Sequence, residues 1–215
     1  HNAIKGLSGT KTVIVEVNKT PTGLQIVLSR THSDFVRAIF ELEVPEVYDK
    51  TVEIHKIVRE PGYRTKLAVY SNRDDVDPVG ACVGPKGSRV QNIVSELQNE
   101  KIDIVKWDED PAVYIANALS PAQVISVTVD EDEKSSSVVV PDYQLSLAIG
   151  KAGQNARLAA KLTNWKIDIK SESQAAELAA QAEAPQDSEP ADDIDILSDL
   201  AMPAADEGTA DTEGE

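Results

Sequence analysis

The chain has 215 residues, of which 41% are hydrophobic and only 4% aromatic. This length accommodates one to three small domains with cores of Val, Ile, Leu and Ala. The single cysteine excludes an internal disulfide and offers no zinc-ligand spacing, which favours a reducing, cytoplasmic setting. No run of about 18 apolar residues is present, so we expect no membrane span. The chain begins at His1 without a secretory signal pattern, and we expect it to be part of a longer protein.

The net charge of −16 is unevenly distributed. Residues 171–215 contain 14 acidic residues and no lysine or arginine, which leaves 21 basic and 23 acidic residues in 1–170, a net charge of −2. A nearly neutral folded part can still carry a local basic strip. The overall charge therefore does not exclude a nucleic-acid partner.

Two β-branched segments at 12–17 and 24–29 are separated by turn residues and predict a β-hairpin. Two strands alone are marginally stable in water. We therefore expect residues 1–31 to be the end of a larger β domain.

A repeated unit starts at residue 32. Helical spacing of Phe35, Ile39 and Leu42 predicts a helix over 33–43, with Ser33 as its N-cap. The elements expected next are strands at 51–60 and 65–71, a short helix opened by Asp77-Pro78, a glycine turn at 84–87, a second helix with Val90, Ile93, Val94 and Leu97 on one face, and a strand at 101–107.

The same order starts again at Asp110-Pro111. Strands are predicted at 123–130 and 136–141, followed by a short helix, a glycine turn at 150–153, a second helix and the strand 165–170. The two KIDI strings begin 65 residues apart, which indicates two copies of one small domain. We place these domains at 32–107 and 108–170.

Residues 171–215 are rich in Ala, Glu, Asp, Ser and Pro, and we expect a disordered acidic tail. Its segment 192–201 contains four Ile and Leu residues and is interpreted as a solvated, partly helical stretch or a short partner-binding helix. A further hypothesis is that the tail competes with a nucleic-acid partner by mimicking phosphates.

The two glycine turns, GPKG and GKAG, each lie between two predicted helices. Glycine tolerates positive φ and lets a ligand approach the backbone closely. The helix that begins after each turn presents unpaired N–H groups and the positive end of its dipole, which favour phosphate. Lys86 and Lys151 add a positive charge inside each turn. Neither turn fits the G-x-G-x-x-G or Walker-type motifs, and neither follows a strand.

The element order and the two turns resemble the KH domain, an RNA-binding module whose G-x-x-G loop clamps four backbone nucleotides. The helix and strand that precede each core indicate the type II topology. Four strings, covering roughly residues 24–170, are similar to the tandem KH region of the NusA family of bacterial transcription termination and antitermination factors: SRTHSDFVRAIFELEVPEVYDKTVEI, REPGYRTKLAV, DPVGACVGPKGSRVQNIVSELQNEKIDIV and LSLAIGKAGQNARLAAKLTNWKIDI.

This resemblance implies an α+β fold (α/β sandwich) of two tandem type II KH domains, each a three-stranded sheet covered by helices. In that family an S-one type OB barrel precedes the KH pair, which assigns the hairpin to a barrel remnant. The implied partner is a single strand of RNA, the nascent transcript at RNA polymerase, where binding adjusts pausing, elongation, termination and antitermination. Polymerase contact through a missing N-terminal region and other antitermination factors are implied as well, without catalysis, metal or cofactor.

The RNA-binding residues implied by the resemblance are the two loops and the start of the helix after each: Gly84, Pro85, Lys86, Gly87, Arg89, Gly150, Lys151, Ala152, Gly153, Gln154, Asn155 and Arg157. An apolar groove floor is expected from Val83, Ile149, Ile102 and Ile167.

Two other functions stay open: an accessory module of an exoribonuclease, and a protein–protein scaffold whose loops no longer bind RNA. Cys82 is expected to be a packed small residue, because no His or Asp partner is indicated nearby. Trp107 and Trp165 are expected to pack between the two domains, and Arg59 and Arg64 to form salt bridges at least as readily as RNA contacts.

Overall fold

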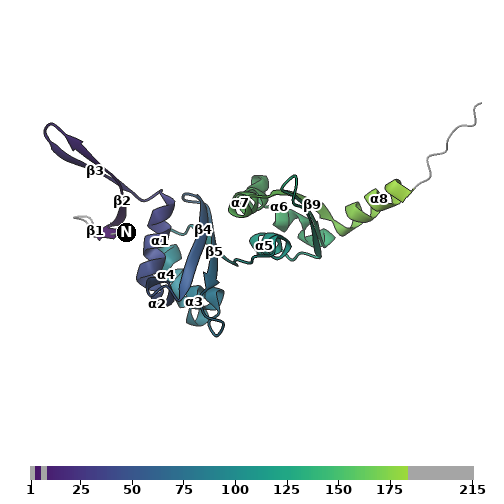
Figure 1. Ribbon diagram of the computed structural model, residues 1–215, viewed down its shortest axis with the longest axis horizontal. Helices are drawn as coiled ribbons and strands as arrows, with labels where there is room; N and C mark the ends of the chain where they lie inside the picture. Colours follow the sequence, from purple (N-terminus) through teal and green to yellow (C-terminus); the bar gives the residue numbers. More distant parts are fainter. Residues whose placement is uncertain (1–2, 6–8, 184–215) are drawn as a thin grey trace, which may run out of the picture. The chain divides into compact units, whose positions relative to one another are not determined.

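The computed structural model describes residues 3–5 and 9–183 of the chain. Three three-stranded sheets follow one another in sequence, and helices pack on the second and the third (Figure 1). The predicted α+β fold, with two repeated units that each contain a three-stranded sheet and helices, is confirmed.

The first sheet is antiparallel and consists of β1 (Ala3–Lys5), β2 (Lys11–Thr20) and β3 (Gly23–Ser29). The predicted hairpin is therefore present, with a third strand added at one edge. Arg30 ties the end of this sheet to the next domain, because its guanidinium donates to the Lys11 carbonyl and lies 3.3 Å from the Glu96 carboxylate.

The first repeated domain has the predicted order of elements. It consists of α1 (Ser33–Glu43), α2 (Pro45–Tyr48), β4 (Val52–Glu60), β5 (Arg64–Ser71), α3 (Pro78–Val83), the 3-10 turn η1 (Pro85–Gly87), α4 (Ser88–Glu96) and β6 (Lys101–Lys106). Strand β5 is central, antiparallel to β4 and parallel to β6. The Asp77 side chain caps α3 by accepting from the Val79 N–H at 3.1 Å, as the Asp-Pro pair predicts.

The second domain repeats this order. It consists of α5 (Pro111–Ala118), β7 (Ser126–Asp130), β8 (Ser135–Val140), η2 (Asp142–Gln144), α6 (Leu145–Ile149), η3 (Lys151–Gly153), α7 (Gln154–Thr163) and β9 (Lys166–Ser171). Strand β8 occupies the central position, antiparallel to β7 and parallel to β9.

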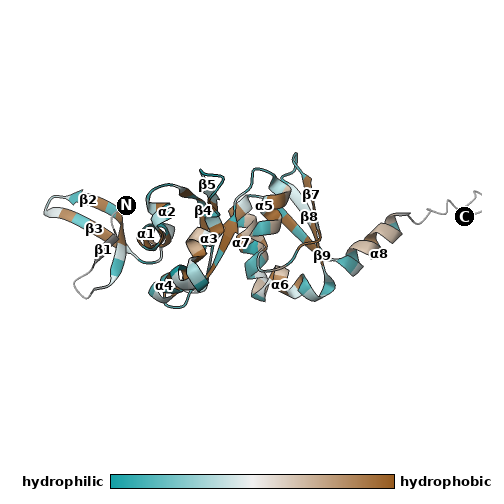
Figure 2. Ribbon diagram, turned by 90° about the horizontal axis from the view of Figure 1, so that it is seen from below, coloured by the Kyte–Doolittle hydropathy of each residue, from teal (hydrophilic) through white to brown (hydrophobic). Residues whose placement is uncertain are grey.

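Both faces of the first domain's sheet are buried. Leu67 and Val69 of β5 belong to that domain's own core, whereas Ala68 between them belongs to the second domain's core. Helices α5 and α7 of the second domain contact this sheet on the face that α1, α3 and α4 leave uncovered (Figures 1 and 2). All residues from 65 to 69 are consequently buried, a pattern of strands covered on both sides.

Polar contacts hold the two domains together at the edge of this apolar contact. Lys66 is fully buried, and its ammonium donates to Asp103 Oδ2 and to the Ser120 carbonyl, both at 2.8 Å. Lys56 donates to the Lys161 carbonyl at 2.5 Å. A buried lysine is tolerated here because each contact satisfies one of its donors.

Two sequence predictions about helices are wrong. The N-cap of α1 is His32 instead of Ser33, because the His32 Nδ1 accepts from the Asp34 N–H at 3.1 Å. Leu42 is 60% exposed, although it shares a helix face with the buried Phe35 and Ile39.

The second error concerns the start of the tail. Strand β9 extends through Ser171, and α8 (Glu172–Glu183) follows. The Asp142 carboxylate supports this junction by accepting from Ser173 N and Oγ. Predictions for residues 184–215, including the segment 192–201, lie outside the described residues.

Within the described residues, no helix is long and apolar enough to cross a membrane, and no group of three or more His, Cys, Asp or Glu side chains is placed to hold a metal ion. Cys82 is fully buried in the first core, and burial raises the pKa of its thiol to about 12. Cys82 is therefore a packing residue, as predicted.

Candidate nucleic-acid interface

The two glycine loops have nearly the same backbone conformation. Gly84 and Gly150, the first residues, have φ/ψ of 74°/173° and 78°/170°. The third residues, Lys86 and Ala152, have 52°/28° and 52°/29°. In each loop the N–H of the last glycine donates to the carbonyl of the first, at 3.0 and 3.1 Å. The four-residue motif therefore encodes one defined turn, built twice.

The first glycine of each loop is required by both conformation and space. Its φ/ψ combination is open essentially to glycine alone. A Cβ on Gly84 would lie 2.5 Å from Arg89 Cγ, and one on Gly150 would lie 2.9 Å from the Asn155 backbone nitrogen. Any side chain here would push the loop away from the helix that follows.

The two lysines occupy different places in the turn. Lys86 is the third residue of its loop and has a left-handed backbone, whereas Lys151 is the second residue of its loop. Both side chains are exposed, as are those of Pro85 and Ala152. Each loop therefore presents one free cation from a different backbone position.

Helices α4 and α7 begin directly at the loops, with Gly87 and Gly153 as N-caps and no side-chain capping bond. The first-turn N–H groups of a helix have no intrahelical partner and carry the positive end of the helix dipole. The first N–H of each helix is already used, since Ser88 donates to the Pro85 carbonyl and Gln154 donates to the Lys151 carbonyl. A phosphate oxygen satisfies both the hydrogen-bonding and the charge requirement of the donors that remain in the first turn.

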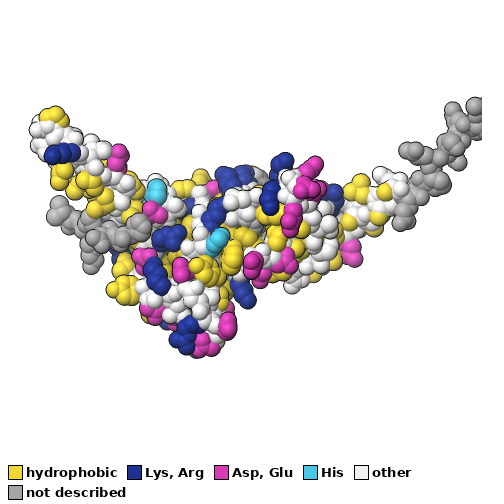
Figure 3. Space-filling view, in the orientation of Figure 1, with side chains coloured by type: hydrophobic (Ala, Val, Ile, Leu, Met, Phe, Trp, Pro, Cys, Tyr) yellow, Lys and Arg dark blue, Asp and Glu magenta, His cyan; other side chains and the backbone are white. Residues whose placement is uncertain are grey.

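Positive side chains stand singly among acidic ones and do not form one large basic patch on the face drawn in Figure 3. This agrees with the near-zero charge of residues 1–170. The loops consequently depend on their own lysines and backbone donors to attract an anion.

Arg89 and Asn155 lie five residues after the first glycine of each loop, and both bind protein groups. Arg89 Nη1 donates to the Ala81 carbonyl at 2.6 Å and to Glu46 Oε2 at 2.9 Å. Asn155 is fully buried, and its Nδ2 donates to the Ala148 and Leu119 carbonyls at 3.0 Å. The expectation that the Asn155 side chain reaches RNA is therefore wrong, since it faces the core.

Gln154 and Arg157 contact the first domain. Gln154 Nε2 donates to Glu60 Oε2 at 2.7 Å, and Arg157 Nη2 donates to Glu60 Oε1 at 2.8 Å. These hydrogen bonds, first from Gln154 and then from Arg157, hold the pKa of the Glu60 carboxyl below its ordinary value. Arg157 stays 46% exposed, so part of its guanidinium is open to a ligand as well.

The expected groove-floor residues are divided between core and surface. Ile102 and Ile167 lie at equivalent register positions, beside Thr65 and Ser136, and pack partly against the first and second cores. Ile149, at the end of α6, is exposed next to the second loop.

Arg59 and Arg64 form salt bridges inside the first domain, which is one of the two roles expected for them. Arg64 Nε lies 2.7 Å from Asp103 Oδ2, and Arg59 binds the fully buried Glu100 carboxylate through two bonds of 2.9 Å. Burial raises the pKa of Glu100, but hydrogen bonds from Arg59, Thr65 and the Gly62 N–H outweigh it, so the pKa lies below its ordinary value.

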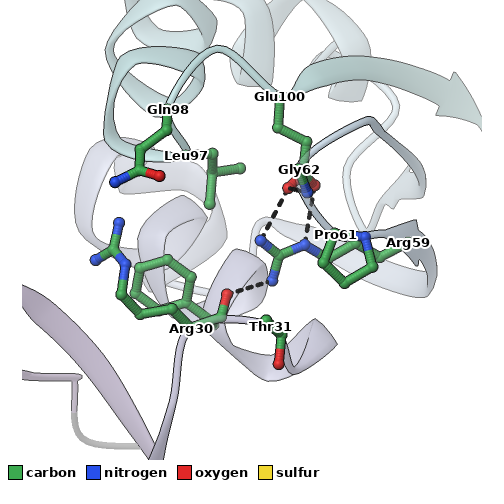
Figure 4. A pocket seen from close by; sticks show the side chains of 9 residues that line it. Arg30, Thr31, Arg59, Pro61, Gly62, Leu97, Gln98 and Glu100 are labelled. Carbon is green, nitrogen blue, oxygen red and sulfur yellow. Dashed lines mark hydrogen bonds and ion pairs between the residues drawn. The ribbon is translucent and has the colours of Figure 1, made fainter.

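Arg30 and Arg59 border a pocket of about 350 Å³ in the first domain, next to the end of the first sheet. Figure 4 shows Arg59 bridging Glu100 and the Arg30 carbonyl. The Arg30 guanidinium lies over the Phe35 ring, 4.6 Å from its centroid. Both guanidiniums are satisfied by protein groups. The pocket is therefore part of the joint between the first sheet and the first domain.

The tryptophans differ in their packing. Trp107 stacks on His55 with ring centroids 4.9 Å apart and packs against the second core, so it lies at the domain junction as predicted. Trp165 packs on the second core, and Lys134 lies over its ring at 4.8 Å. The prediction that Trp165 packs between the domains is not supported by these contacts.

Comparisons with known proteins match both repeated domains. Residues 30–107 match the family described as NusA-like first KH domain, and residues 111–177 match the NusA-like second KH domain. The two matches lie in the family's own order and together cover more than half of the chain.

Curated relatives carry the name transcription termination/antitermination protein NusA. The protein of Halalkalibacterium halodurans is 65% identical over 168 residues, which are 78% of this chain and 44% of the relative. That of Bacillus subtilis is 60% identical over 181 residues, 84% of this chain and 49% of the relative. That of Mycobacterium bovis is 60% identical over 146 residues, 67% of this chain and 42% of the relative. The chain thus spans less than half the length of these relatives, and with both KH domains matched in order it belongs to the NusA family.

Proposed function

We propose that this chain binds single-stranded RNA across its two KH domains, with the G-x-x-G loops as phosphate clamps. The observation that supports this most directly is the shared loop geometry: two turns with the same dihedral angles, each opening a helix without a side-chain cap. Phosphate contacts of this kind position a strand without reading its sequence.

The proposed contacts are the eight loop residues: Gly84, Pro85, Lys86, Gly87, Gly150, Lys151, Ala152 and Gly153. Gln154 and Arg157 border the second loop and contribute from their exposed parts. Arg89 and Asn155 are proposed as positioning residues, because their hydrogen bonds join each loop's helix to protein carbonyls.

The role of this binding is proposed from the relatives' name. In this proposal the RNA is the nascent transcript of a bacterial RNA polymerase in the cytoplasm, and the protein affects pausing, termination and antitermination together with polymerase and other antitermination factors. The chain acts by binding rather than by catalysis. Its assigned regions remain the barrel remnant at 1–31, the KH domains at 32–107 and 108–170, and the acidic tail, which now begins after α8.

Exposed apolar side chains support the assignment of the first sheet to a barrel. They are Val15, Val17, Leu24, Ile26 and Leu28 on β2 and β3. A barrel would cover such side chains on its inner face.

The test is RNA affinity after reversing the charge of each loop. We expect Pro85→Asp/Lys86→Asp and Lys151→Asp/Ala152→Asp each to weaken binding of a single-stranded RNA by about tenfold or more, because carboxylates then face phosphates. Fluorescence anisotropy at low salt with the 215-residue chain measures this.

A matched control is Pro45→Asp/Lys50→Asp in the same domain. It replaces the same residue types, changes the charge equally, and Lys50 also has a positive φ of 67°. Equal affinity of the loop variants and this control would favour the scaffold function instead. Shortening of labelled RNA by the unmodified chain would favour the exoribonuclease alternative.

A further inference from the structure

A pocket of about 300 Å³ lies where the two KH domains meet, and only part of its lining belongs to a glycine loop. The first domain contributes Glu60 and Tyr63, and the second contributes Lys151, Ala152, Gln154 and Arg157. The pocket therefore places the second glycine loop opposite the β4–β5 turn of the other domain.

Tyr63 is held by its backbone and free at its ring. Its N–H donates to the Glu60 carbonyl at 3.0 Å, and its carbonyl accepts from the Lys101 N–H at 3.1 Å. The residue is nevertheless 72% exposed. An aromatic ring on a fixed turn, beside a phosphate-binding loop, provides a stacking surface for a base.

Glu60 has one acceptor position left. An ionised carboxylate offers about four lone-pair sites. Arg157 uses two on Oε1 and Gln154 uses one on Oε2, which leaves a site on Oε2. Since the pKa of Glu60 is lowered, this group stays an acceptor at neutral pH and donates no proton.

We infer that this junction pocket is a nucleotide subsite in which Tyr63 stacks on a base and Glu60 accepts from its exocyclic amino group. Adenine, cytosine and guanine each carry an exocyclic amino donor, whereas uracil carries only carbonyl oxygens at those positions. The carboxylate therefore attracts the first three bases and disfavours uracil. The inference rests on the proposed RNA-binding function and adds to it a position of base preference between the two loops.

A purely structural role explains only part of the pocket. Glu60 joins the domains through Gln154 and Arg157, and this accounts for the carboxylate. It gives no reason for an aromatic ring at position 63, where most of the side chain faces solvent.

The experiment scans a single-stranded RNA with the 215-residue chain. Each nucleotide in turn is changed to A, C, G, U or an abasic unit, and affinity is measured by anisotropy. We expect one position at which A, C and G bind at least about fivefold more tightly than U. Glu60→Gln should remove this preference, because an amide both donates and accepts.

Tyr63→Ala should weaken binding about tenfold when that position carries a base, and should not weaken binding when it is abasic. Tyr63→Phe should keep the affinity, since it keeps the ring. Tyr48→Ala is the matched control, because Tyr48 is an equally exposed tyrosine of the same domain at the end of α2.

The outcomes separate the two proposals. Absence of RNA binding in the unmodified chain overturns the proposed function together with this subsite. Binding with no base preference at any position, or with a preference that Glu60→Gln leaves unchanged, overturns the subsite alone. The base ratio is measured within one variant, so it stays informative if Tyr63→Ala does not fold or if Glu60→Gln changes affinity uniformly.

Discussion

The two glycine loops share a backbone and differ in almost every side chain around it. Their dihedral angles agree within a few degrees, although GPKG and GKAG have only the glycines in common. The glycines therefore determine the shape of the turn, while the residues between them are free to vary the charge that it presents.

The residue five positions after the first glycine shows the same principle. Arg89 in the first domain and Asn155 in the second both donate to a carbonyl at the end of the helix before the loop, Ala81 and Ala148. Such carbonyls lack an intrahelical partner. Two unrelated side chains thus satisfy one requirement of the fold, and they fasten each loop from behind.

The largest expected effect comes from adding a methyl group at the first glycine. Gly150→Ala should lower the free energy of unfolding by about 3 kcal/mol, because it adds backbone strain of about 1–3 kcal/mol to an overpacking cost of similar size. Gly84→Ala should cost a comparable amount, since the added Cβ would lie 2.5 Å from Arg89 Cγ, near the root of a side chain that is itself bound to the Ala81 carbonyl. Urea unfolding followed by tryptophan fluorescence compares the two.

Gly153→Ala provides the reference for strain without a clash. Gly153 has φ of 72°, but nothing lies within 4 Å of the added Cβ. We expect a cost of about 1–2 kcal/mol. Equal losses at Gly150 and Gly153 would show that backbone conformation alone, and not the approach of α7, requires the first glycine.

An intermediate effect on the free energy of unfolding is expected when Asn155 or Arg89, which fasten the loops, is replaced. Asn155→Ala leaves two buried carbonyls without their donor and should cost about 2 kcal/mol of unfolding free energy. Arg89→Ala should cost about 1 kcal/mol, because its partners are only partly buried and water replaces part of the contact. Chemical denaturation measures both.

RNA binding tests the role of Arg89 independently of protein stability. If Arg89 fastens the loop without contacting phosphate, its removal leaves the dependence of affinity on salt unchanged. A salt slope that falls by about 0.7, the value for one lost phosphate contact on a single strand, would contradict the anchoring role.

The sequence predicts those parts of the fold that depend on local patterns. Asp-Pro pairs, glycine turns and β-branched runs gave both repeats in the correct order, because each depends on a few neighbouring residues. His32 replaced Ser33 as the cap because either side chain can accept from the first turn, and packing decides between them. Helix α8 was missed because its first turn is held by Asp142 of η2, which lies 31 residues before Ser173 in the chain.

The candidate site divides in the same way. The loops were found from their motif, whereas the roles of Arg89 and Asn155 depend on carbonyls of other elements. Glu60 and Tyr63 were missed, because they join the site only when the two domains pack together. In the structure every residue from Thr65 to Val69 is buried, whereas only every second residue of β8 is buried. The sequences TKLAV and SSSVVV do not show this difference, because neither alternates between polar and apolar residues.

The smallest expected effect concerns the two lysines. Lys86→Ala and Lys151→Ala should each weaken RNA binding a few-fold and reduce the slope of log K against log salt by about 0.7. Lys86→Ala keeps the loop conformation, because Ala152 already occupies the equivalent left-handed position in the other loop. Anisotropy titrations over a range of salt concentrations measure the slope.

The exchange Lys151→Ala/Ala152→Lys asks whether the place of the charge matters. It gives the second loop the lysine position of the first, at unchanged net charge and with the same left-handed backbone at the third residue. If the glycines set the shape and either intervening position can present the cation, the salt slope stays at the unmodified value. A slope reduced as far as in Lys151→Ala would instead mean that the phosphate lies on one side of the turn, and that the two loops hold the RNA strand in different ways despite their common backbone.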